Sequence, residues 1–167
     1  RESVVLALCG GIVCLALILA PVTPLLPGFS LDGREYLEVY NPDDARMVEL
    51  LEEDRYATGL VEAAGNYDYY TRVATFSGVP AFIGWPSVEI QWGRNPRAVA
   101  ERVQAAERIY RDPGAPYPLM EQYHLSHLVI GGQELQTYGN ISVNPAGFEP
   151  QYLGSAGTLL RRVQVVA

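Results

Sequence analysis

The sequence predicts an α/β protein, with one N-terminal transmembrane helix followed by a small mixed α/β domain outside the cytoplasm. Two observations lead to this fold class. The run Ser3–Ser30 contains no charged side chain. Over residues 31–167, helix-like and strand-like patterns alternate, which is typical of helices packed on a sheet. The second part is long enough, at about 135 residues, to form one hydrophobic core.

The apolar run predicts a retained membrane span. Val4–Ala20 is almost purely Val, Leu, Ile, Ala, Cys and Gly, and Pro21–Leu26 extends it toward the length of about 20 residues that crosses a bilayer. A secretory signal peptide and a buried helix of a soluble domain are the alternatives. The absence of an initial Met, the adjacent Arg1 and Glu2, and the Pro-rich end of the run argue against a signal peptide. We expect residues 1–27 to be the last span of a longer multi-pass protein, 28–42 a linker and 43–167 the α/β domain.

The charge distribution predicts on which side of the membrane this domain lies. Because Arg1 and Glu2 cancel, residues 31–167 carry the whole net charge of -7, with 18 acidic residues against 11 Arg. Cytoplasmic segments beside membrane spans are enriched in Lys and Arg, so we expect residues 31–167 outside the cytoplasm. The expected partners are then the lipid bilayer and the upstream transmembrane helices of the same protein. An acidic chain without a basic run excludes a nucleic-acid partner.

The elements of the domain follow from apolar spacing and from the positions of Pro, Gly and Asn. An extended linker is expected to run to Tyr40. Asn41–Asp44 combines a cap residue, an early Pro and two acids, which predicts the start of a helix that reaches about Asp54. The further expectations are a short strand at 59–63, a Tyr-rich turn at 67–72, strand-like pieces at 73–83, helices at 95–110 and 117–123, a buried strand at 125–130 and closing strands at 148–153 and 158–166.

The segment Arg72–Arg94 is the strongest functional candidate, because it holds both Trp residues of the chain among charged and amide side chains. Its candidate substrate-binding residues are Arg72, Trp85, Glu89, Gln91, Trp92 and Arg94. Its Gly and Pro content predicts a structured loop. Indole faces stack on the C–H faces of pyranose rings while charged groups bind hydroxyls, so this composition favours a sugar site. The alternative is a Trp-anchored plug that packs on the sheet. A buried Glu89 requires a nearby Arg, for which Arg72 and Arg94 are the candidates.

The same segment resembles the signature of a polytopic membrane-protein family of archaea and Chloroflexi, the YYY membrane proteins. The family pattern is similar to R-x-S-x-x-T-G-x-P-x-x-x-G-W-x-x-H-E-x-Q-W-R-G, and the matches are Arg72, Gly78, Pro80, Gly84, Trp85, Glu89, Gln91 and Trp92. The chain departs from the pattern at Val88, where the family has His, at Ile90, where Trp is usual, and at Gly93–Arg94. Tyr123–Gly131 also resembles a family motif, and the similarity covers nearly the whole chain.

The resemblance implies the C-terminal part of a multi-pass cell-membrane protein similar to C-type glycosyltransferases that use polyprenyl-phosphate sugars. It also implies that this part assists the binding of a lipid-linked sugar or glycan, because the essential acids of such transferases lie in an N-terminal loop. The alternative is a non-catalytic extracytoplasmic domain that binds a glycan or a protein, or one that only covers the membrane helices.

The residues themselves indicate no catalytic group, metal ion or cofactor. Glu62, Glu89 and Glu134 are candidate carboxylates for a glycosidase, but their spacing does not fix the separation that such chemistry needs. His124 and His127 would lie on opposite sides of the predicted strand, and no third metal ligand has a suitable spacing.

Overall fold

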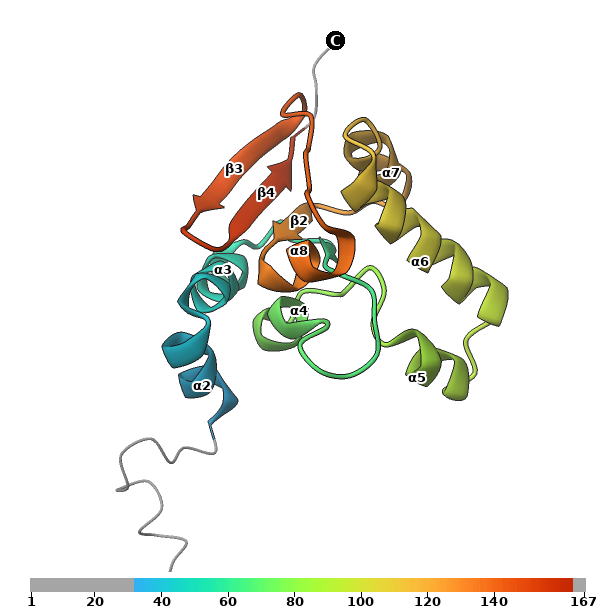
Figure 1. The fold of residues 1–167 in the computed structure, drawn as a ribbon, viewed down its shortest axis with the longest axis horizontal. Coiled ribbons are helices and arrows are strands. Elements are labelled where there is room, and N and C mark those ends of the chain that lie inside the picture. The colour runs from blue at the N-terminus through green and yellow to red at the C-terminus, as the bar shows by residue number, and fades with distance from the viewer. Residues whose placement is uncertain (1–31, 164–167) are drawn as a thin grey trace, which may run out of the picture.

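The computed structural model describes residues 32–163, which contain seven helices and four strands (Figure 1). In chain order these are α2 (Gly33–Tyr40), α3 (Pro42–Glu53), β1 (Leu60–Val61), α4 (Arg72–Ser77), α5 (Pro86–Gln91), α6 (Pro96–Arg111), α7 (Pro116–Gln122), β2 (His127–Ile130), α8 (Gly132–Tyr138), β3 (Phe148–Leu153) and β4 (Thr158–Arg162). The predicted mixed α/β class is therefore confirmed for this part of the chain. The predicted span at 1–27 lies outside it. Within residues 32–163, no helix is both long and apolar enough to cross a membrane.

The four strands form one mixed sheet in the order β1-β2-β4-β3. β1 runs parallel to β2, with Leu60 opposite His127, whereas β4 is antiparallel to both β2 and β3. The parallel pair requires a long crossover, and the chain from β1 to β2 supplies it with helices α4 to α7. The carboxyl ends of β1 and β2 consequently meet at the same edge of the sheet.

The core has two halves, one on each face of the sheet. Neighbouring strand residues point to opposite faces: Leu60 and Val129 pack with α2, α3 and α4, whereas Val61 and Leu128 pack with α6 and α7. Figure 1 shows α2 and α3 on one side of β2, and α6 and α7 on the other. Because β2 is covered on both faces, its sequence is apolar throughout except for His127. The result is a three-layer α/β/α arrangement.

Several predicted elements are confirmed with small shifts of their ends. The helix predicted to start at Asn41–Asp44 is α3, in which the Asn41 side chain makes no capping hydrogen bond, and the predicted helices at 95–110 and 117–123 are α6 and α7. Asn95 caps α6 by accepting a hydrogen bond from the backbone N–H of Arg97 at 2.9 Å. The buried strand is β2, and the closing strands are β3 and β4.

Three predictions of local structure are wrong. The expected extended linker contains helix α2, which is capped by Asp32 and buries Leu37 against the core of the sheet. The strand-like pieces at 73–83 contain helix α4, which ends at Gly78 with φ 73°, and the expected loop also contains α5. Helix α8, directly after β2, has no predicted counterpart.

Candidate functional site

The two Trp residues flank the short helix α5. Trp85 immediately precedes Pro86, whose fixed φ and missing N–H suit the first position of a helix. Trp92 follows the helix, and its backbone N–H donates to the carbonyl of Val88 at 2.9 Å. The six residues of α5 therefore set the separation of the two indoles.

A groove of about 560 Å³ runs between these indoles. It is lined by Thr71, Thr75, Gly84, Trp85, Val88, Glu89, Trp92 and Arg94. Four of the six predicted binding residues thus share one concavity. Gln91 is exposed on α5 and does not line the groove, and Arg72 lies elsewhere.

Glu89 and Arg94 form the polar side of the groove. One carboxylate oxygen of Glu89 accepts a hydrogen bond from the backbone N–H of Gly84 at 2.7 Å, and the other pairs with Arg94 Nη1 at 2.8 Å. The Glu89 side chain is 15% exposed, whereas that of Arg94 is 58% exposed. The expected arginine partner of Glu89 is therefore Arg94, with guanidinium donors still open to solvent.

The two indoles have different surroundings. Trp85 is half-buried, donates from Nε1 to the carbonyl of Tyr70 at 3.2 Å, and lies 5.1 Å from Tyr67 between ring centroids. Trp92 is 85% exposed. Its indole lies at the solvent-exposed edge of the groove and contributes little to the core.

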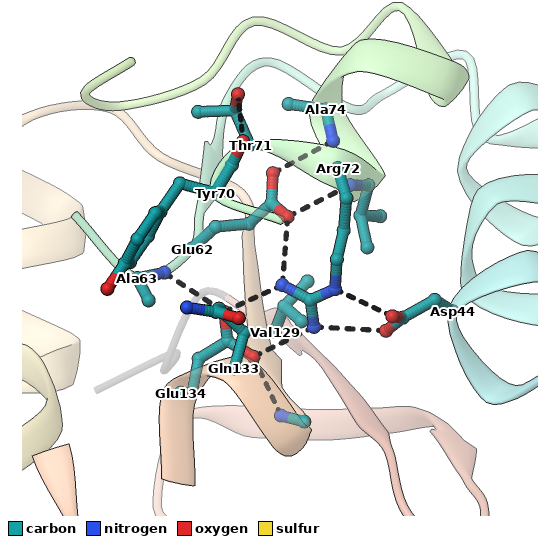
Figure 2. A network of polar contacts seen from close by, with 12 residues as sticks. Asp44, Glu62, Ala63, Tyr70, Thr71, Arg72, Ala74, Val129, Gln133 and Glu134 are labelled. Carbon is teal, nitrogen blue, oxygen red and sulfur yellow. Dashed lines mark hydrogen bonds and ion pairs between the residues drawn. The ribbon is translucent and has the colours of Figure 1, made fainter. Parts of the chain in front are cut away.

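Arg72 lies at the centre of a buried ionic cluster with Asp44, Glu62 and Glu134 (Figure 2). Its Nε and Nη2 donate to the two oxygens of Asp44 at 2.6 and 3.0 Å. Its Nη1 and Nη2 donate to the two oxygens of Glu134 at 3.1 and 3.0 Å, and Nη1 lies 3.5 Å from Glu62. Every N–H of the guanidinium therefore has a carboxylate beside it. The prediction of Arg72 as a residue of the Trp site is not supported by this placement.

The same carboxylates also hold the backbone at the sheet edge. Glu62, just after β1, accepts hydrogen bonds from the backbone N–H groups of Val73 and Ala74 at 2.9 and 2.8 Å, and so caps α4. Glu134 accepts from the backbone N–H groups of Ala63 and Gly131 at 3.0 and 2.9 Å. The cluster therefore joins the carboxyl ends of β1 and β2 to the starts of α4 and α8.

Protonation in this cluster is shifted by burial. Burial disfavours the charged form of Glu62 and raises its pKa to about 7. Arg72 and the two backbone N–H groups favour the carboxylate, and Glu134 disfavours it by repulsion, but burial has the largest effect. The pKa of Arg72 is raised despite its burial, because Glu134 and Asp44 stabilise the guanidinium. Three carboxylates against one arginine leave the cluster negative whether or not Glu62 is protonated.

The two-carboxylate glycosidase arrangement is not formed by the candidate acids. Glu62 and Glu134 are 2% and 0% exposed, so no substrate reaches them, while Glu89 lies in the separate Trp groove. Sequence reasoning missed the partnership of these two acids with Arg72. The available signal was the position of the acids after apolar strands: Glu62 directly follows β1, and Glu134 lies in the first turn of the helix after β2.

A line of contacts joins Ser126, His127 and Asp54. It has the residue types of a hydrolase triad, but the serine oxygen is not free to attack a substrate. His127 Nδ1 lies 2.9 Å from Ser126 Oγ, and its Nε2 lies 3.3 Å from Asp54. However, Ser126 Oγ also accepts from the backbone N–H groups of Thr58 and Gly59 and donates to the Gly59 carbonyl. These backbone groups occupy the positions from which the oxygen would attack a substrate. The three residues therefore tie the chain before β1 to β2.

Residues 32–163 contain no group of three or more His, Cys, Asp or Glu side chains suited to hold a metal ion. Comparison of the chain with protein-family models, curated proteins and solved structures finds no match. The resemblance of Arg72–Arg94 to a membrane-protein signature therefore stays a sequence-based expectation.

Proposed function

We propose that the groove between Trp85 and Trp92 binds a sugar, as part of an extracytoplasmic domain of a membrane protein similar to lipid-linked sugar transferases. The observation that supports this is the conjunction of two indoles, one of them 85% exposed, with the Glu89–Arg94 pair in a single groove. Apolar walls with a few fixed polar groups are the usual composition of small-molecule sites. The carboxylate accepts hydrogen bonds from sugar hydroxyls, and the guanidinium donates them.

The domain assists substrate binding in this proposal and does not itself break a glycosidic bond. Among residues 32–163, Glu89 is the one carboxylate that lines the groove, and it is paired with Arg94. Hydrolysis by the common mechanisms needs a second carboxylate across the bond. The lipid-linked donor and the membrane location belong to this proposal through the sequence resemblance and the charge-free run Ser3–Ser30.

Sugar binding is tested with the full chain in a polyoxyethylene detergent, which has no sugar headgroup to compete. Binding of immobilised glycans is compared for wild type, Trp92→Ala, Glu89→Gln and the control Gln91→Ala. Trp92 and Glu89 line the groove, whereas Gln91 lies on the same helix outside it. We expect binding to fall at least about tenfold for the two groove variants, since stacking and a charged hydrogen bond each contribute about 1–3 kcal/mol. Equal binding by all four proteins, or none by wild type, would refute the proposal.

The second candidate, a domain that binds a partner protein, is favoured by the exposure of Trp92 alone. Exposed aromatic residues frequently anchor protein interfaces. In that case Trp92→Ala weakens capture of the partner, whereas Glu89→Gln and free monosaccharides have no effect. Competition by free sugar therefore separates the two functions.

A further inference from the structure

A second cavity also borders Trp85, next to the groove described above. It has a volume of about 360 Å³ and is lined mostly by apolar atoms. Its lining residues are Gly33, Tyr36, Leu37, Asp68, Tyr69, Tyr70, Arg72, Thr75, Phe76 and Trp85. It therefore lies between α2, the turn before α4 and the helix α4 itself, and only Thr75 and Trp85 also border the groove.

Aromatic rings dominate the walls of this cavity. Tyr36 and Tyr69 lie 6.4 Å apart between ring centroids, tilted by 31°. The ring of Phe76 reaches the wall at Gly33, where an added Cβ would lie 3.1 Å from its tip. Trp85 adds a further ring to the lining. The faces of such rings are negative, because the π electrons form a quadrupole, and they attract organic cations.

The charges around the cavity also favour a cation over an anion. Arg72 lines the wall, but its N–H groups are taken by Asp44 and Glu134 with Glu62 beside them, so it has no donor left for a phosphate or carboxylate. The cluster behind the wall is net negative. At the rim, Asp68 is exposed and makes no ion pair with any residue of the described part of the chain. A positively charged ligand therefore meets negative potential at the rim and behind the wall.

The position of the cavity in the fold is also one where ligands bind. Arg72 and its carboxylates lie at the carboxyl ends of the parallel strands β1 and β2, and the cavity is outside this edge of the sheet. Ligands of open α/β sheets bind outside the carboxyl ends of the strands. Here the ionic cluster fills the inner part of that position, and the aromatic cavity borders the cluster at Arg72.

We propose that this cavity binds a quaternary ammonium group, such as the trimethylammonium group of choline. The group carries its charge on a surface of methyl groups, which matches aromatic walls better than a strongly hydrated ammonium does. It needs no hydrogen-bond acceptor, and Asp68 supplies a counter-charge at the rim. The source is either a free compound of this class or the headgroup of a choline lipid. The proposal is independent of sugar binding, because it depends on residues of α2 and of the turn before α4.

The test uses the full chain in polyoxyethylene detergent and follows Trp fluorescence during titration with choline. The neutral isostere 3,3-dimethylbutan-1-ol, which replaces nitrogen by carbon, is titrated in parallel. We expect saturable binding of choline and at least about fivefold weaker binding of the isostere, because only the cation interacts with the ring quadrupoles. Equal affinity for both compounds, or no saturation by choline, would overturn the proposal.

Variants identify the cavity as the site. Tyr36→Leu removes a lining ring from the half-exposed face of α2, and Asp68→Asn removes the rim charge. Tyr56→Leu is the matched control, since Tyr56 is 74% exposed and lies outside the cavity. We expect the choline Kd to rise roughly fivefold for Tyr36→Leu and roughly threefold for Asp68→Asn, with no change for the control. An unchanged Kd in both cavity variants contradicts the assignment. Trp92→Ala, which is expected to weaken sugar binding in the groove, is expected to leave choline binding intact.

Two bilayers distinguish the sources of the ligand. The chain is placed in nanodiscs of phosphatidylcholine or of phosphatidylethanolamine, which have the same net charge, and soluble choline is titrated into both. Weaker apparent binding in phosphatidylcholine supports a lipid headgroup in the cavity, because the headgroup competes. Equal, saturable binding in both supports a free ligand. Absence of choline binding in both bilayers refutes the site in either form.

Discussion

Glu62 allows the ionic cluster to be tested by its effect on stability at different pH values. The carboxyl is 2% exposed, lies 3.5 Å from Arg72, and accepts hydrogen bonds from two backbone N–H groups at the start of α4. Its pKa rises from 4.5 to about 7 on folding, chiefly because burial disfavours the charged form. The substitution Glu62→Gln keeps the shape of the side chain and removes the titration.

The sign and size of the effect follow from this pKa difference. Between pH 4.5 and about 7 the folded protein holds a proton on Glu62 that the unfolded chain has released. The contribution of this carboxyl to stability is therefore fully present below pH 4.5 and is lost as the pH rises through about 7. Since one pKa unit corresponds to about 1.4 kcal/mol, the loss amounts to roughly 3 kcal/mol.

His127 changes stability in the opposite direction in part of this range. Burial lowers the pKa of its imidazole below 6.5, although Asp54 opposes the shift, so stability falls as the pH drops through the region below 6.5. The total pH dependence of the wild type therefore mixes two effects. The difference between wild type and Glu62→Gln removes the contribution of His127, because both proteins contain it.

The measurement is urea unfolding of both proteins from pH 4.5 to pH 8, followed by Trp fluorescence in one detergent. Glu62→Gln is expected to be less stable at pH 4.5, because its amide cannot accept from both backbone N–H groups, at a cost of about 1–3 kcal/mol. That deficit should shrink, and then vanish or reverse, as the pH rises to 8. A constant difference across the range, or one that grows with pH, shows that Arg72 and the amides keep Glu62 ionised and refutes the reasoning.

Further predictions concern other parts of the molecule. Arg72→Met leaves three buried carboxylates without a cation, so the free energy of unfolding at pH 8 should fall by about 3–5 kcal/mol. In the same urea assay, part of this lost stability should return at pH 5. Gly131→Ala places a Cβ 2.9 Å from Arg72 Nη2, and thermal melting should show a loss of about 1–3 kcal/mol, with no loss for Gly132→Ala. Trp92→Ala should shift the melting temperature by less than the resolution of the scan, because the indole is 85% exposed. A reporter enzyme fused after Ala167 should be active only outside the cytoplasm, and cytoplasmic activity would contradict the proposed topology.

The sequence predicted the elements whose signals are local. Asn41 and Asn95 each precede a Pro, and both helices begin there, because cap and first-turn preferences act within a few residues. The β3–β4 pair was recognisable from two neighbouring runs with strand composition. Helix α4 was missed, because its start depends on Glu62, eleven residues earlier, whose carboxylate accepts from Val73. A partner at that distance leaves no local pattern.

Only the part of the candidate site that is local in sequence could be predicted. Trp85, Glu89, Trp92 and Arg94 are held by one short helix and its ends, so their proximity in sequence becomes proximity in space. Arg72 belongs to the same run of sequence, but its partners Asp44 and Glu134 are 28 and 62 residues away. Composition alone could not separate an arginine of a surface groove from one at the centre of the fold.

The arginine of the groove and the arginine of the buried cluster contribute differently to stability. The two charged residues of the groove form a pair whose arginine is mostly exposed, so the pair contributes little to stability, whereas the cluster around Arg72 fixes the edge of the sheet. The groove and the aromatic cavity meet at Trp85, whose indole is held by the carbonyl of Tyr70, two residues before Arg72. A change in the cluster is therefore expected to act on the cavity directly, because Arg72 lines it, and on the groove through the backbone between Arg72 and Tyr70, whose carbonyl holds Trp85.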